Sequence, residues 1–174
     1  MSAAAPRLLV WVGSASACIR IAKRADFTLS VDFKELLKEL LRRGCRCLVM
    51  DLSGCEFMDS TFLGVLATFG RELSRGNGAQ AAQRIELYNA SAPLTELLDT
   101  MGVLDLFRIS QGTPTLPADS QPLERKAITP SKAEVSRTCI EAHQALMDIS
   151  PANIARFKDV TQFLAESLKK ATPE

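Results

Sequence analysis

The sequence predicts an α/β fold with a mainly parallel central sheet flanked by helices, followed by a C-terminal helical hairpin extension. Apolar and amphipathic segments alternate over about the first 110 residues, as in parallel sheets whose strands are joined by helical crossovers. Residues 47–52 form a continuous apolar run, typical of a central strand covered on both faces. A proline-rich stretch follows the alternating part. We therefore expect a domain at residues 1–110, a linker at 111–130 and a helical extension at 131–174.

The chain begins with two predicted strands. Residues 8–12 and 17–22 are apolar and flank a small polar turn, so they are expected to form an antiparallel edge of the sheet. A helix is predicted next, because apolar residues recur on one helical face. Ser30 is its expected N-cap and Gly44 its expected C′ residue. The apolar positions of this helix are Phe33, Leu36, Leu37, Leu40 and Leu41.

The middle of the domain repeats the strand and helix pattern. The strand at 47–52 is followed by a short acidic loop and a helix. Two more strands and one more helix complete the domain, and the last helix starts near a proline and ends at a glycine. The predicted ranges are a helix at 61–75 closed by Gly76-Asn-Gly78, a strand at 82–88, a helix at 93–101 ended by Gly102, and a short turn with an edge strand within 103–109.

Two helices are predicted beyond the linker. Ser131-Lys-Ala-Glu134 is a capping-box pattern, and Val135, Cys139, Ala142 and Leu146 share a face after it. Ser150-Pro151 begins the second helix. About 45 residues of helical hairpin bury little core alone. The extension is therefore expected to dock on the sheet domain or on a partner.

Composition excludes several classes of function. The 174 residues carry 47% hydrophobic and 24% charged side chains, typical of a globular protein. The net charge of +1, from 21 basic and 20 acidic residues, gives no reason to expect nucleic-acid binding. No apolar run approaches the ~18 residues of a membrane span, and no signal peptide is recognised. Five scattered cysteines fit buried thiols in a reducing compartment better than a metal site. We expect a cytoplasmic protein without membrane insertion or bound metal.

The segment from Leu48 to Leu66 is the candidate functional site. A strand leads through an acidic loop into Asp59-Ser60 and directly into a helix. The loop therefore lies at the carboxyl end of a strand, where open α/β folds place their working surface. The free N–H groups of the helix start favour a phosphate on Ser60. Glu56 and Asp59 would make such a phosphorylated patch strongly anionic. The plain alternative is an N-cap cluster without further function, and Thr61 is a second hydroxyl at the same end.

Two motifs carry a family resemblance. Phe57-Met-Asp-Ser-Thr-x-Leu-Gly64-Val-Leu resembles the signature of STAS domains, specifically the bacterial anti-sigma-factor antagonists. Asn89-Ala-Ser-Ala-Pro-Leu-x-x-Leu-Leu-Asp-x-Met-Gly102 is similar to the segment before the final strand of that family. The resemblance covers roughly residues 8–110. It implies a single STAS-like domain that carries the helical hairpin as an extension.

The resemblance implies a regulatory protein-binding domain that is a kinase substrate and no enzyme itself. Ser60 would be the phosphoacceptor, with Thr61 as the less favoured one, and Asp59 would orient the loop. An anti-sigma factor that is also a serine kinase would bind the unmodified form and be released on phosphorylation. A PP2C-type phosphatase would reverse the change, and the chain would need no cofactor. The residues expected at the partner surface are Asp26, Glu56, Asp59, Ser60, Thr61, Phe62 and Gly64.

Two residues depart from the family pattern. Phe62 stands where the family usually has glycine, so a ring is expected either to obstruct a partner or to contact it. In Lys23-Arg-Ala-Asp26 the aspartate is kept, but Arg24 reverses the usual acidic charge. A partner complementary to that acidic group would meet a cation instead.

Two other functions compete with partner switching. A STAS subunit of a lipid-transport ABC complex would contact its ATPase constitutively through the same helix end. An enzyme with Ser60 as nucleophile is disfavoured, because His143, the only histidine, lies far away in the sequence and is expected to be a solvated or half-buried helix residue. The pattern leaves open the oligomeric state and whether the extension serves dimerisation, docking or partner choice.

Overall fold

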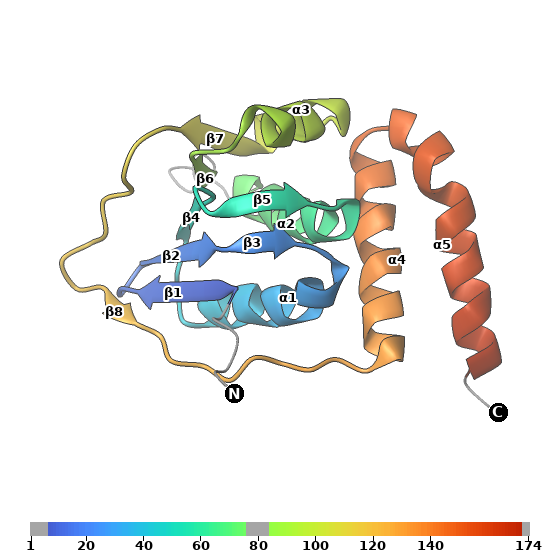
Figure 1. The fold of residues 1–174 in the computed structure, drawn as a ribbon, viewed down its shortest axis with the longest axis horizontal. Coiled ribbons are helices and arrows are strands. Elements are labelled where there is room, and N and C mark those ends of the chain that lie inside the picture. Colours follow the sequence, from blue (N-terminus) through green and yellow to red (C-terminus); the bar gives the residue numbers. More distant parts are fainter. Residues whose placement is uncertain (1–6, 76–83, 172–174) are drawn as a thin grey trace.

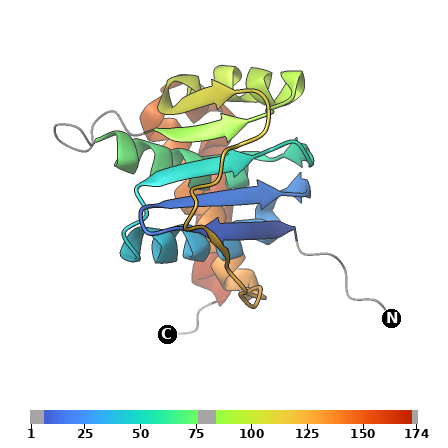
Figure 2. The same ribbon diagram turned by 90° about the vertical axis from the view of Figure 1, so that its left-hand side faces the viewer.

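The centre of the protein is a six-stranded sheet in a computed structural model that describes residues 7–75 and 84–171. The strand order is β7-β6-β4-β2-β1-β8 (Figures 1 and 2). The pairs β2/β4, β4/β6 and β6/β7 are parallel, whereas β1 is antiparallel to both β2 and β8. The predicted α/β class with a mainly parallel sheet is therefore confirmed. The bounds are β1 Leu8–Val12, β2 Ser16–Ile21, β4 Cys47–Asp51, β6 Ile85–Tyr88, β7 Phe107–Ser110 and β8 Gln121–Pro122.

A second, two-stranded sheet lies where the sequence predicted only loops. Strand β3 (Lys23–Ala25) pairs in parallel with β5 (Cys55–Met58), and both point toward helix α4 in Figure 1. Ala25 lies opposite Met58 in the pairing register. Because parallel strands end at the same edge, the residues that follow these two positions lie side by side. This small sheet therefore brings the starts of two helices together.

Helix α1 (Phe27–Arg42) begins one turn earlier than predicted. Its N-cap is Asp26, whose side chain accepts a hydrogen bond from the Thr28 amide. Ser30, the expected cap, lies fully buried inside the helix, and its hydroxyl donates to the Asp26 carbonyl. Asp26 and Ser30 both precede apolar residues at a spacing that suits an N-cap. Asp26 is the cap because β3 ends at Ala25. Gly44 has a φ of +89° just after the helix, as expected of a C′ glycine.

The other helices of the domain agree with the sequence pattern to within a residue or two. Helix α2 (Ser60–Ser74) has Asp59 as N-cap, and α3 (Ala92–Thr100) is capped by Ser91. A 3₁₀ turn at Leu104–Leu106 precedes β7. The predicted turn at 76–78 and the first two residues of the predicted strand at 82–88 lie outside the described residues.

The linker is fastened to the domain along its length. It runs past one side of the molecule, and α4 and α5 stand at the opposite side (Figures 1 and 2). Strand β8, which the sequence did not predict, pairs with β1. Arg125 then forms two hydrogen bonds of 2.6 and 3.0 Å with the buried carboxylate of Asp32 on α1, and the Ile128 amide donates to the same carboxylate. The chain is therefore held against α1 up to residue 128.

The predicted C-terminal hairpin is present. Helix α4 (Lys132–Ile149) starts with the expected capping box between Ser131 and Glu134, and α5 (Ala152–Ala171) follows. Helix α4 packs across α1 and α2, and α5 packs on α4 (Figure 1). Asn153 is fully buried, and its amide donates to the carbonyls of Met101 and Leu146. We call α4 and α5 together the C-terminal arm.

Removing the linker's buried cation is expected to destabilise the protein. The Arg125→Met substitution leaves the Asp32 carboxylate, 5% exposed, without its counter-charge, which costs about 3 kcal/mol in similar cases. Chemical denaturation measures the loss. The control is Arg43→Met, which breaks the exposed Arg43–Glu39 pair on α1 and is expected to cost less than about 0.5 kcal/mol. Equal losses for the two variants would contradict the anchoring role of Arg125.

Candidate functional site

One carboxylate holds the starts of α1 and α2 together. Asp59 accepts hydrogen bonds from the Phe62 amide at 2.8 Å and from the Phe27 amide at 2.7 Å, one on each carboxylate oxygen. Its own amide donates to the Ala25 carbonyl at 3.0 Å. Burial raises the pKa of Asp59, and these backbone hydrogen bonds act against that rise. Asp59 therefore caps α2 and in addition ties it to the first residue of α1.

Asp26 caps the neighbouring helix and lies in a basic setting. Burial alone would raise the pKa of Asp26, but hydrogen bonds from Thr28, Arg7 and Arg24 outweigh it and hold the pKa below its usual value. The Arg7 guanidinium lies 3.2 Å from the carboxylate. The side chain of Arg24 is 59% exposed and stacks over the ring of Phe57 at 4.3 Å. The expected cation at position 24 is thus present, partly neutralised by Asp26.

Ser60 is the first residue of α2, and its hydroxyl contacts the C-terminal arm. The Ser60 Oγ and the His143 Nε2 share a hydrogen bond of 2.9 Å. The imidazole of His143 is buried and stacks on the ring of Phe157, with 4.6 Å between centroids and 2° between planes. Burial lowers the pKa of His143, so the ring is neutral near pH 7. Ser60 is therefore partly covered by a side chain of α4.

The expectation that His143 is solvated or half-buried is wrong, because the residue is buried. Ser60 and His143 are 83 positions apart, and only the docking of α4 on α2 joins them. The predicted apolar face of α4 includes Ala142, next to His143, and this was the one signal for the placement. The pair lacks the third group of a catalytic triad, because the His143 Nδ1 has no hydrogen-bond partner among the described residues. We interpret the hydrogen bond between Ser60 and His143 as a packing contact between α2 and α4.

Thr61 and Gly64 also lie under α4. Thr61 is buried, and its hydroxyl donates to the Cys139 sulfur at 3.4 Å. A Cβ atom added to Gly64 would clash with the carbonyl oxygen of Ala142. The two helix backbones touch at this glycine. In this conformation both predicted partner-binding positions contact the arm.

The prediction that Phe62 faces a partner is wrong. Its ring is fully buried and stacks on Phe33 of α1, with ring centroids 4.2 Å apart. The side chain points from α2 into the core because residue 62 follows the N-cap by three positions and lies on the inner face of the helix. Phe62 therefore contributes to the packing between α1 and α2 and is no part of the surface.

Two exposed phenylalanines lie next to the capping aspartates. Phe27 follows Asp26 and is 48% exposed, and Phe57 lies two residues before Asp59 and is 42% exposed. Phe27 was not expected at the surface of a helix start, because the start of α1 was predicted at a later residue. Glu56, a predicted partner residue, lines a small hollow with Ser91 and Pro93 of the α3 region.

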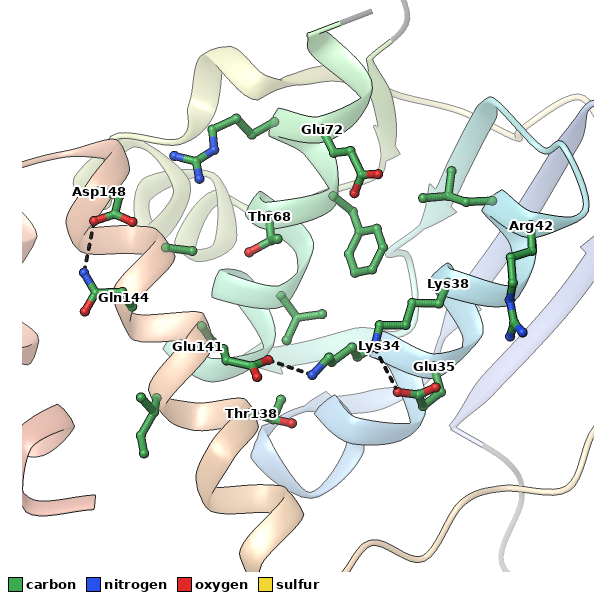
Figure 3. Close-up of a pocket in the computed structure, with 17 residues that line it drawn as sticks. Lys34, Glu35, Lys38, Arg42, Thr68, Glu72, Thr138, Glu141, Gln144 and Asp148 are labelled. Carbon is green, nitrogen blue, oxygen red and sulfur yellow. Dashed lines mark hydrogen bonds and ion pairs between the residues drawn. The ribbon is translucent and has the colours of Figure 1, made fainter. Parts of the chain in front are cut away.

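A groove of about 1000 Å³ lies between α1, α2 and α4 (Figure 3). Lys34 of α1 and Glu141 of α4 form an ion pair of 2.7 Å across it. Its other charged groups are of both signs, and the walls between them are apolar. Within residues 7–75 and 84–171, no group of three His, Cys, Asp or Glu side chains is placed to hold a metal ion. No helix in the same ranges is long and apolar enough to cross a membrane.

Similarity to known proteins covers most of the sheet domain. A family model described as "Mlab, STAS domain" matches residues 12–108. No curated protein matches the chain. Two solved structures are similar to it: the anti-sigma factor antagonist SpoIIAA in its unphosphorylated form, and the Bacillus cell fate determinant SpoIIAA in the phosphorylated form. The first is 18% identical, with a TM-score of 0.47 over 62% of this chain and 87% of that one. The second is 19% identical, with a TM-score of 0.46 over 58% and 87%.

The buried position of Phe62 predicts a structural effect. Phe62→Ala is expected to lower the free energy of unfolding by about 3 to 5 kcal/mol, because it removes a ring from the interface between α1 and α2. Phe57→Ala, which removes an exposed ring stacked with Arg24, is expected to cost less than about 1 kcal/mol. Thermal or chemical denaturation compares them. A small loss for Phe62→Ala would contradict its place in the core.

The buried neutral imidazole predicts a pH dependence. Because the pKa of His143 is lowered in the folded protein, the unfolded chain binds the proton more readily below about pH 6.5. The stability from the neutral ring is present above that pH and is lost as the pH falls toward the folded pKa. Denaturation from pH 8 to 5 is expected to show the wild type losing stability relative to His143→Gln. A pH-independent difference between the two proteins would contradict the buried neutral state.

Proposed function

Because the chain belongs to the STAS domain family, we propose that it is a regulatory partner-binding protein switched by phosphorylation of Ser60. The unmodified form binds an anti-sigma factor that is also a serine kinase, and it acts in the cytoplasm. The kinase transfers the γ-phosphoryl group of ATP to the Ser60 Oγ, with release of ADP and the hydroxyl proton. A PP2C-type phosphatase hydrolyses the phosphoserine with water and returns serine and inorganic phosphate.

The observation that carries this proposal is the double hydrogen bonding of Asp59. Both of its oxygens are engaged with backbone amides of α1 and α2, so the carboxylate is held in place and Ser60 is the first side chain after it. The Ser60 hydroxyl stands at the N-terminus of a 15-residue helix, where backbone N–H groups and the helix dipole favour an anion. A kinase thus finds the acceptor on a rigid element.

The charges around Ser60 explain how a phosphate would change binding. Phosphorylation of Ser60 adds nearly two negative charges at neutral pH. These charges lie close to Asp59, the N-cap of α2, and Asp26 caps the neighbouring helix α1. An acidic partner surface would be repelled, and Phe27 and Phe57, the exposed rings beside these aspartates, would lose an apolar contact with it. Arg24, over the Phe57 ring, favours a partner that offers an acidic group at this edge.

A constitutive contact is the alternative function. In a STAS subunit of a lipid-transport ABC complex, the start of α2 would bind the ATPase without modification. The hydrogen bond between Ser60 and His143 favours this alternative, since it gives the hydroxyl a lasting structural use. Both functions assign the chain a binding role and no catalysis.

Mass spectrometry of the protein from its own cells tests the switch. Phosphate on Ser60 is expected, and Ser60→Asp is expected to bind the cognate partner at least about tenfold more weakly than Ser60→Ala, because it places a like charge against an acidic surface. The control Thr113→Asp puts the same charge at an exposed linker position and should leave binding unchanged. Persistently unmodified Ser60, together with co-purification of a transporter ATPase, would overturn the proposal in favour of the alternative.

A further inference from the structure

The C-terminal arm occupies the end of α2 that carries Ser60. Three successive contacts join α4 to this end. The Thr61 hydroxyl donates to the Cys139 sulfur, and the Ser60 hydroxyl shares a hydrogen bond with His143. Between them, the Ala142 backbone packs against Gly64. Ser60 and Gly64 are four residues apart, and Cys139 and His143 likewise. Each pair therefore lies on one face of its helix. The two faces fit each other over a full helical turn.

The crossing at Gly64 leaves no space between the helices. A Cβ atom added to Gly64 would clash with the Ala142 carbonyl oxygen, so even a methyl group is excluded there. One turn earlier on α2, the Ser60 Oγ is already at hydrogen-bond distance from an imidazole, and that imidazole is stacked against Phe157 of α5. Neither helix can move back to admit a larger group while the arm is docked.

We propose that the C-terminal arm is an intramolecular lid over Ser60 and that docking of the arm and phosphorylation of Ser60 exclude each other. This inference rests on the proposed function in one respect, the choice of Ser60 as acceptor. A kinase reaches the hydroxyl only after α4 has left α2. A phosphate once attached keeps α4 away. By thermodynamic linkage, each state disfavours the other by the same factor.

Size and charge both support the exclusion. A phosphoryl group adds a phosphorus and three oxygens beyond the Ser60 Oγ, where His143 is only 2.9 Å away. The charge would also need a nearby cation. Burial lowers the pKa of His143 in the unmodified protein, so protonating the buried ring opposite a phosphate would cost free energy, and the Asp59 carboxylate beside Ser60 repels the phosphate. The docked arm thus leaves the phosphate no room, and the side chain that faces it is an uncharged ring in the unmodified protein.

The attachment of the arm suits a lid. The linker is anchored to α1 through Arg125 and the Ile128 amide, and α4 begins at Lys132. Only Thr129, Pro130 and Ser131 lie between the anchor and the helix, so a released arm stays close to its seat at a high effective concentration. The strand pairings and the linker anchors involve no residue of α4. Release of the whole arm also breaks the hydrogen bond from Asn153 to the Met101 carbonyl and exposes the face of α2.

The face of α2 that α4 covers indicates which features a competing partner needs. A backbone that replaces α4 has to approach Gly64 as closely as Ala142 does. We expect a partner helix with a small residue at this crossing and a hydrogen-bonding side chain one position later, opposite Ser60. Such a helix competes with α4 for the same surface.

Hydrogen exchange on protein with phosphoserine installed genetically at position 60 tests the exclusion. The amides of residues 139–146 are expected to exchange at least about tenfold faster than in the unmodified protein, and those of β4 and β6 are expected to keep their protection. Equal protection of residues 139–146 in both proteins would overturn the inference. This test needs neither the kinase nor the partner.

Matched charge variants on α4 provide the control for arm release. Ala142→Glu places a carboxylate against Gly64 and is expected to reproduce the fast exchange of residues 139–146 in unmodified protein. Gln144→Glu adds the same charge at an exposed position two residues away and is expected to leave the arm docked. Fast exchange in both variants, or in neither, would contradict the seat at Gly64. Loss of protection in β4 would indicate general unfolding of the variant. Hydrogen exchange on the phosphoserine protein would then be the test of the inference.

The two proposals fail in different ways. Unmodified Ser60 in the cells of origin would refute the phosphorylation switch, while the exclusion would still be measurable on the installed phosphoserine. Protected α4 in the phosphoserine protein would refute the lid, while partner loss in Ser60→Asp would be unaffected.

Discussion

The site depends on the carboxylate of Asp59. Its two oxygens bind the first turns of two different helices, and its amide continues the pairing of the small β3/β5 sheet. Free N–H groups at helix starts need hydrogen-bond acceptors. The Asp59 side chain accepts from one such group on α1 and one on α2, and it thereby holds the starts of the two helices together. The position of Ser60, the burial of Phe62 and the contact between α1 and α2 all follow from this arrangement.

The close crossing of α2 and α4 adds a second constraint. A glycine at position 64 lets the backbones touch, and this approach brings His143 to the Ser60 hydroxyl. In this STAS domain the start of α2 is thereby covered by the chain's own extension. Under the proposed lid, binding of an outside partner at this place would include the free energy of removing α4. A small change in the fit of α4 would shift that balance.

Much of the fold could be predicted, because it follows from local patterns. The central strand at 47–52, the start of α2 and the capping box of α4 each depend on residues within a few positions of one another. The start of α1 could not, since Asp26 and Ser30 both suit an N-cap and only the end of β3 selects the first. Strands β3 and β5 are short, and their residues look like loop residues without the pairing partner. The burial of Phe62 depends on Phe33, which belongs to another element.

The sequence by itself determined the α/β class, the helical extension and the place of Ser60 at the start of a helix, because hydrophobic period and capping chemistry act over short distances along the chain. Only the tertiary structure decided that Ser60 is partly covered and paired with His143. That contact joins residues 83 positions apart, and it depends on the shape of two helix surfaces that meet at Gly64. Steric fit between distant segments produces no periodic pattern of hydrophobic residues in either segment.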